Sequence, residues 1–179
     1  MILRVLTSLG ALMMMMSFSP GWAWLGSRRW AMRMLLGHLL LAELAAAAPD
    51  GVTLVEDFQF QIEHALDLVG QDIALFIDAA ASGAAPFCFA EIRPARSRAP
   101  SSHALSPDAV LQVYAETLGV PPPAFVLAVR GASFALGAPL SSVAQAHLEA
   151  ARPLLAACLA HPDVDAWRRL VHPRPSAAD

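Results

Sequence analysis

Hydrophobic residues follow two different periods along the chain. Nearly continuous apolar runs at 72–80 and 124–134 are typical of strands buried on both faces of a sheet. Shorter apolar runs predict strands at 52–58 and 86–92, and helical patterns occupy 35–48, 61–70, 106–119 and 141–160. Because helices alternate with apolar strands, the sequence predicts an α/β fold: a twisted, mainly parallel sheet sandwiched between helices.

The ends of the two long helices carry clear signals. Ser106 can cap the helix over 106–119, Pro107 suits its first position, and Gly119 ends it. Ser141 or Ser142 is expected to start the last helix.

The segment 61–70 predicts an amphipathic helix that stops at Gly70. With a helical period, Ile62, Ala65, Leu66 and Val69 fall on one face, and we expect that face to pack on the core.

The chain divides into three parts by composition. Residues 1–34 form an atypical hydrophobic N-terminal segment, 35–162 an α/β domain, and 163–179 a polar tail that we expect to be loose at its end. The apolar run after Arg4 has roughly the length of a signal peptide, but it is too short for a confident membrane-spanning helix, which needs about 20 apolar residues. A signal peptide or short anchor is therefore an alternative for this segment.

Composition narrows the class of function. A net charge of −3, with every basic residue an arginine, gives no indication of a nucleic-acid partner. Cys88 and Cys158 lack the spacing of a redox or zinc motif, so free thiols in a reducing compartment, the cytoplasm, are expected.

Two residues stand where an α/β fold gathers its ligands. Asp78 ends the apolar strand at 72–80, and ligands of open α/β sheets bind at the carboxyl ends of strands. His103 lies in the loop before the helix at 106–119. A neutral imidazole beside a carboxylate suits a metal such as nickel or zinc. The alternatives are that Asp78 caps the next turn and that His103 is an ordinary loop histidine.

Other polar residues give weaker signals. Ser101 or Ser102 beside His103 could suggest a serine hydrolase, but the chain has no GxSxG motif. Cys88 lies inside an apolar strand and is better explained as core than as a nucleophile. Four other histidines are expected to be exposed or half-buried: His38, His64, His147 and His161.

Four segments together resemble the hydrogenase maturation proteases, the endopeptidases that remove the C-terminal extension of the [NiFe] hydrogenase large subunit after nickel insertion. These segments are 56–68, 72–80, 101–111 and 125–148, within a resemblance that covers about residues 35–160. It implies a hydrolase in which Asp78 and His103, with a third acid, contact nickel held by the precursor. The catalytic group stays unknown. The resemblance also implies no permanent cofactor, a large-subunit precursor as partner, and no role for a membrane.

The chain departs from this family near its N-terminus. The family begins with a strand and a Gly-Asn loop that carries an acid, whereas residues 19–34 hold no acidic residue. We therefore expect both the first strand and the third metal ligand to be missing. An unfilled sheet position would expose backbone and apolar surface, which predicts poor solubility and impaired activity.

Several explanations of this departure stay open. The first explanation is that the coding DNA is read in the wrong frame. If Trp30–Met34 is encoded TGG-GCG-ATG-AGG-ATG, translation from the third base gives Gly-Asp-Glu-Asp. Alternatively, Glu56 or Asp57 replaces the missing acid. Two further alternatives are a non-catalytic module that binds the large subunit and an exported α/β domain.

Overall fold

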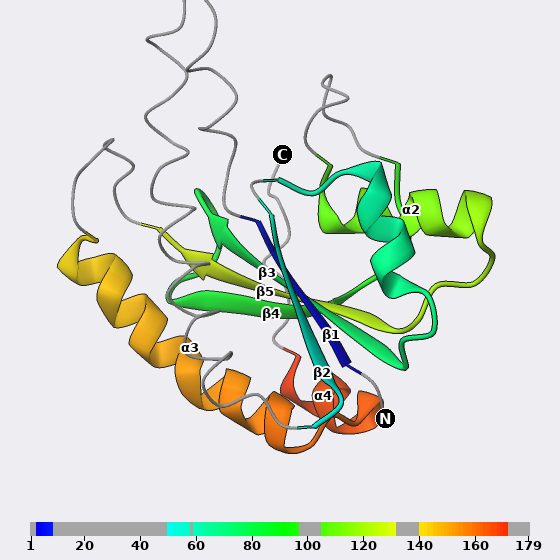
Figure 1. Ribbon diagram of the computed structural model, residues 1–179. Helices are drawn as coiled ribbons and strands as arrows, with labels where there is room; N and C mark the ends of the chain where they lie inside the picture. The colour runs from blue at the N-terminus through cyan, green and yellow to red at the C-terminus, as the bar shows by residue number, and fades with distance from the viewer. Residues whose placement is uncertain (1–2, 9–49, 58, 97–104, 132–139, 172–179) are drawn as a thin grey trace, which may run out of the picture.

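The computed structural model describes residues 3–8, 50–57, 59–96, 105–131 and 140–171. The described strands form a five-stranded sheet in the order β2-β1-β3-β5-β4, in which β4 alone runs antiparallel to its neighbour (Figure 1). Their bounds are β1 Leu3–Ser8, β2 Val52–Asp57, β3 Ile73–Ala80, β4 Phe87–Ile92 and β5 Ala124–Arg130. The predicted fold class, a mainly parallel sheet between helices, is confirmed.

The first strand is present, and our expectation that it is missing was wrong. β1 lies between β2 and β3 and runs parallel to both, with Val5 and Leu6 fully buried. Local pattern missed this strand because the six residues of β1 stand in front of a longer apolar run with no helix or strand period. With the sheet position filled, the predicted poor solubility loses its physical basis.

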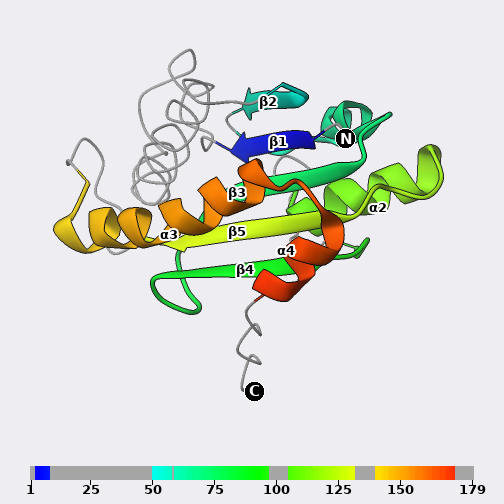
Figure 2. The ribbon, with the colours of Figure 1, turned by 90° about the horizontal axis from the view of Figure 1, so that it is seen from below.

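Helices cover both faces of the sheet. The 3₁₀ helix η3 (Ile62–Leu68) and the helix α2 (Pro107–Thr117) pack on one face, and α3 (Ser142–Ala160) and α4 (Val164–Leu170) pack on the other (Figures 1 and 2). We call these the α2 face and the α3 face. Among the described residues, no helix combines the length and apolarity needed to cross a membrane.

The α3 face is closed by aromatic rings. The Trp167 ring lies 5.1 Å from that of Phe125 and 6.1 Å from that of Phe89, between centroids, and all three side chains are fully buried. The indole N–H of Trp167 donates to the carbonyl oxygens of Cys158 and His161, at 3.1 and 3.0 Å. One tryptophan therefore anchors this short helix in the core. The end of the polar tail, which we expect to be loose, lies outside the described residues.

The buried side of η3 differs from the predicted one. Ile62, Leu66 and Val69 are exposed by 58, 64 and 51%, whereas His64 and Leu68 are buried. Of the four residues predicted to face the core, Ala65 alone does so. The segment forms a 3₁₀ helix with three residues per turn, so the 3.6-residue period assigned the wrong side.

The predicted helix starts are confirmed. Ser106 precedes α2 as its N-cap with Pro107 in the first position, and Gly119 follows the helix with a φ of 104°. At α3, Ser141 is the cap, and its hydroxyl accepts from the backbone N–H of Ala144 at 3.2 Å.

Candidate functional site

Asp78 stands near the carboxyl end of β3, as predicted. Successive side chains of a strand point to opposite faces, and Phe76 and Ile77 belong to the cores of the α2 and α3 faces respectively. Asp78 therefore points to the α2 face. Its Oδ1 accepts a hydrogen bond from the backbone N–H of Ala79 at 2.8 Å, inside the strand. This bond gives no support to the alternative that Asp78 caps the following turn.

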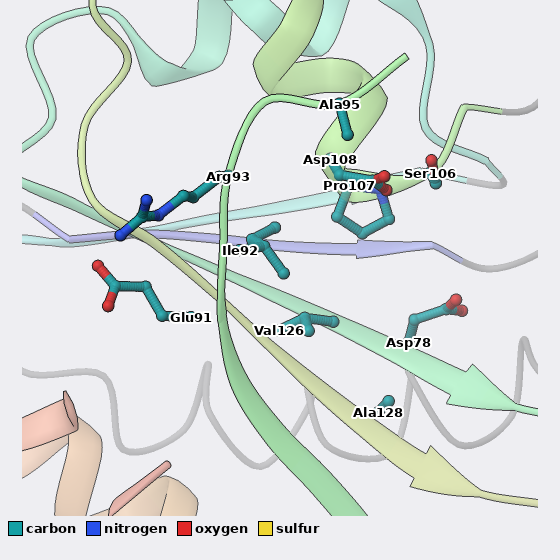
Figure 3. A pocket seen from close by; sticks show the side chains of 10 residues that line it. All are labelled: Asp78, Glu91, Ile92, Arg93, Ala95, Ser106, Pro107, Asp108, Val126 and Ala128. Atoms are coloured by element: carbon teal, nitrogen blue, oxygen red, sulfur yellow. The ribbon is translucent and has the colours of Figure 1, made fainter. Parts of the chain in front are cut away.

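A pocket of about 590 Å³ opens beside Asp78 (Figure 3). β3, β4, β5 and the start of α2 contribute its walls, so the pocket lies on the α2 face of the sheet. The residues that line it include Asp78, Asp108, Glu91 and Arg93, with Val126 and Ala128 on its floor. In β4, Glu91 shares the face of Phe89, so its carboxylate points to the α3 face and not to Asp78. A mixed lining of this kind suits a polar peptide better than an apolar small molecule.

Glu91 forms an ion pair with Arg168 of α4. Arg168 donates to both carboxylate oxygens of Glu91, with Nη2 at 2.8 Å from Oε1. The hydrogen bond from Arg168 is the main cause that lowers the pKa of Glu91. Glu91 is therefore ionised near neutral pH and unsuited to act as a general acid in the pocket.

A second carboxylate, also at the carboxyl end of a strand, lies beside a histidine. Asp57 ends β2, and its Oδ2 lies 3.5 Å from Nε2 of His64 in η3. The Nδ1 atom of His64 accepts the backbone N–H of Gln61 at 2.9 Å. The His64 side chain is 6% exposed, so the expectation that this histidine is exposed or half-buried was wrong. A period of three aligns His64 with Gln61 and Asp67, so no periodic signal in the sequence marks His64 as buried.

Glu56 and Asp57, the two residues that could replace the missing acid, point to opposite faces. Leu54 packs against the core of the α3 face and Val55 against that of the α2 face. Strand alternation then directs Glu56 to the α3 face and Asp57 to the α2 face, where Asp78 also points. Asp57 and Asp78 thus share one face and one edge of the sheet.

The other predicted metal-contacting residue, His103, lies outside the described residues, as does His38. Within the described part of the chain, no three His, Cys, Asp or Glu side chains converge closely enough to hold a metal ion. Of the other predicted histidines, His147 is half-buried and its Nδ1 lies 2.7 Å from the carbonyl oxygen of Arg130, while His161 is exposed.

Solved structures match this arrangement of strands and helices. The hydrogenase maturating endopeptidase HybD from E. coli superposes with a TM-score of 0.57 at 18% identity, over 88% of this chain and 92% of HybD. The fold is that of the hydrogenase maturation endopeptidases. The [NiFe] hydrogenase maturation protease HycI from Thermococcus kodakarensis gives the same TM-score and coverage at 17% identity. A hydrogenase 2 maturation peptidase from a Thaumarchaeota archaeon matches with a TM-score of 0.53 at 14% identity, over 89% of this chain and 98% of that one.

The resemblance seen in the sequence is thereby confirmed at the level of the fold. No protein-family model and no curated protein matches the chain. In this chain the sheet includes β1, which the sequence alone did not reveal as a strand.

Proposed function

We propose that this protein is an endopeptidase that removes the C-terminal extension of a [NiFe] hydrogenase large-subunit precursor after nickel insertion. The observation that carries the proposal is the position of Asp78, near the carboxyl end of a buried parallel strand and in the wall of a polar pocket, within the maturation endopeptidase fold. Such strand ends are where α/β folds place their ligands.

In this proposal Asp78 and His103 contact the nickel that arrives with the precursor. Nickel is part of the substrate, the protein keeps no permanent cofactor, and the reaction takes place in the cytoplasm. The exported alternative is less consistent with β1, because removal of the N-terminal run as a signal peptide would take the strand between β2 and β3 out of the sheet.

A processing assay tests the proposal. Nickel-loaded large-subunit precursor is incubated with the purified chain, and loss of the C-terminal extension is followed by intact mass. We expect cleavage by the unaltered chain, at a rate lowered by the missing third acid, and none by Asp78→Ala or His103→Ala. The matched control is Asp72→Ala, which removes an exposed carboxylate just before the opposite end of β3. This control is expected to cleave normally.

Three results would argue against the proposal in different ways. Binding of the precursor without cleavage would favour a non-catalytic module. Equal cleavage of nickel-loaded and nickel-free precursor would show that the protein does not recognise nickel. Normal cleavage by Asp78→Ala would show that the pocket beside β3 is not the site.

A further inference from the structure

Residues 1–42 supply no acidic side chain to the carboxyl ends of the strands. No aspartate or glutamate occurs in residues 1–42, which include β1 and the residues that follow it. A carboxylate that works together with Asp78 must therefore come from later in the chain. Glu56 and Asp57, at the end of β2, are the described acids nearest to β1 in the sheet register, where Glu56 pairs with Thr7 and Asp57 with Ser8.

Sheet register brings Asp57 and Asp78 to the same level of the sheet. Thr7 of β1 pairs with Glu56 on one side and with Ile77 on the other, so the next residues, Asp57 and Asp78, lie at equivalent heights. One strand separates them, which sets their Cα atoms about 10 Å apart, twice the strand spacing. The two carboxylates therefore lie on the same face of the sheet, one on each side of β1.

The tautomer of His64 follows from its two contacts. A backbone N–H can only donate, so the Nδ1 atom that accepts from Gln61 carries no proton. The ring proton is then on Nε2, the atom that faces the Asp57 carboxylate. His64 is a neutral donor held by burial and by its cap on η3, and it restrains one oxygen of Asp57. The Asp57 side chain is still 35% exposed, so a substrate can reach it.

We infer that Asp57 is the general base of the proposed peptidase and that His64 is its positioning residue. This inference rests on the proposed function. The Asp57 carboxylate takes a proton from a water molecule as the water oxygen attacks the scissile carbonyl carbon. When the C–N bond breaks, the protonated Asp57 returns that proton to the leaving nitrogen. Water is consumed, and Asp57 ends the cycle ionised.

The roles of the two acids then differ. Asp78 binds the metal-bearing part of the precursor, and Asp57 acts on the peptide bond. This division of roles is testable. The two roles affect different measured quantities. Loss of a binding group raises the Kd of the precursor, whereas loss of a general base lowers the rate constant of cleavage.

The first test compares Asp57→Asn with Glu56→Gln, its neighbour on the opposite face. Single-turnover cleavage of nickel-loaded precursor gives the rate constant, and binding of the precursor gives Kd. We expect Asp57→Asn to lower the rate constant roughly 100- to 10,000-fold, the usual contribution of a general base, with Kd changed less than about threefold. Glu56→Gln is expected to leave both values within about threefold.

The second test separates the two contacts of His64, the hydrogen bond that it accepts from Gln61 and its contact with Asp57. His64→Gln keeps an N–H donor at the position of Nε2 but loses the acceptor for Gln61, and His64→Asn keeps the acceptor but cannot reach Asp57. If His64 positions the base, Asn lowers the rate constant roughly 10- to 100-fold while Gln retains most of it. A purely structural histidine would give rates that follow the thermal stability of the two variants instead.

The outcomes separate this inference from the function on which it rests. Cleavage by the unaltered chain together with normal cleavage by Asp57→Asn would overturn the inference and leave the peptidase assignment intact. A large rise in Kd for Asp57→Asn would also overturn it, because Asp57 would then be a binding group. No cleavage by the unaltered chain, under conditions where the precursor binds, would overturn both.

Discussion

The two faces of the sheet differ in the polarity of their side chains. The α3 face is closed by apolar side chains around Trp167, Phe89 and Phe125, and its hydrogen bonds serve to fix that packing. The α2 face has an apolar core of similar construction, but its rim carries Asp57, Asp78 and the buried His64.

This difference follows from sheet geometry. In a parallel sheet each face is covered by helices, and polar groups are tolerated where the strands end and water enters. In our proposal the α3 face contributes mainly stability, and the chemistry takes place at the carboxyl ends of the strands on the α2 face. Substitutions should separate the two, with loss of stability on the first and loss of activity on the second.

The largest expected effect concerns the two cysteines, one on each face. Burial raises the pKa of Cys158, on the α3 face, to about 12, whereas Cys88 packs on the α2 side and is partly exposed. At pH 8 we expect Cys158 to react with a thiol reagent about a thousandfold more slowly than an ordinary thiol, because only its thiolate is nucleophilic. Reaction of the native chain with a chromogenic disulfide should show one fast thiol, and denaturant should release the second. Two equally fast thiols would contradict the burial of Cys158.

Next comes Trp167→Ala in α4. Removal of a fully buried tryptophan should lower the free energy of unfolding by about 3–5 kcal/mol, through lost burial and the cavity left behind. Urea unfolding measures the change. Arg169→Ala, an exposed position in the same helix, is the control and should stay within about 0.5 kcal/mol. Equal effects of the two changes would mean that α4 is not anchored in the core.

A matched pair in η3 tests which side of this helix faces the core. Leu68→Ala should cost about 2–5 kcal/mol of unfolding free energy, because Leu68 is fully buried. Leu66→Ala should cost less than about 0.5 kcal/mol, because its side chain is 64% exposed. Equilibrium unfolding of both variants measures the difference, and the reverse order would restore the helical face expected from the 3.6-residue period.

The smallest effect concerns Glu91 and Arg168, an ion pair near the surface. Arg168 lowers the pKa of Glu91 in the folded chain, so the pair stabilises the fold above the ordinary carboxyl pKa. That stability is lost as the pH falls through the lowered pKa of the folded state. Glu91→Gln should therefore lower the melting temperature slightly at pH 7 and not at all at strongly acid pH. A difference that persists at low pH would point to packing rather than charge.

The sequence predicted the α/β class and most of the strands correctly because each strand carries its own burial signal. The run at 72–80 is apolar on both faces whatever its neighbours are, and Asp78 is polar where that run ends. β1 was missed for the opposite reason. Its residues look like the start of a longer apolar segment, and only pairing with β2 and β3, some fifty and seventy residues away, identifies them as a strand.

The acids at the end of β2 show the same limit at the level of single residues. Glu56 and Asp57 are adjacent and chemically alike, so the sequence could not choose between them. The register of β2 against β1 decides which one points to the face of Asp78, and the 3₁₀ geometry of η3 brings His64 to Asp57.

By itself, then, the sequence determined what each segment prefers: buried strands at 72–80 and within 124–134, helices that start at Ser106 and at Ser141 or Ser142, and a carboxylate near the end of the first of these strands. Only the tertiary structure decided the place of β1 in the sheet, the anchoring of α4 by Trp167, the buried side of η3 and the pairing of Asp57 with His64. The reason is physical. Local periodicity records whether a side chain is buried, but strand register and side-chain pairing depend on contacts between residues that are far apart in the chain.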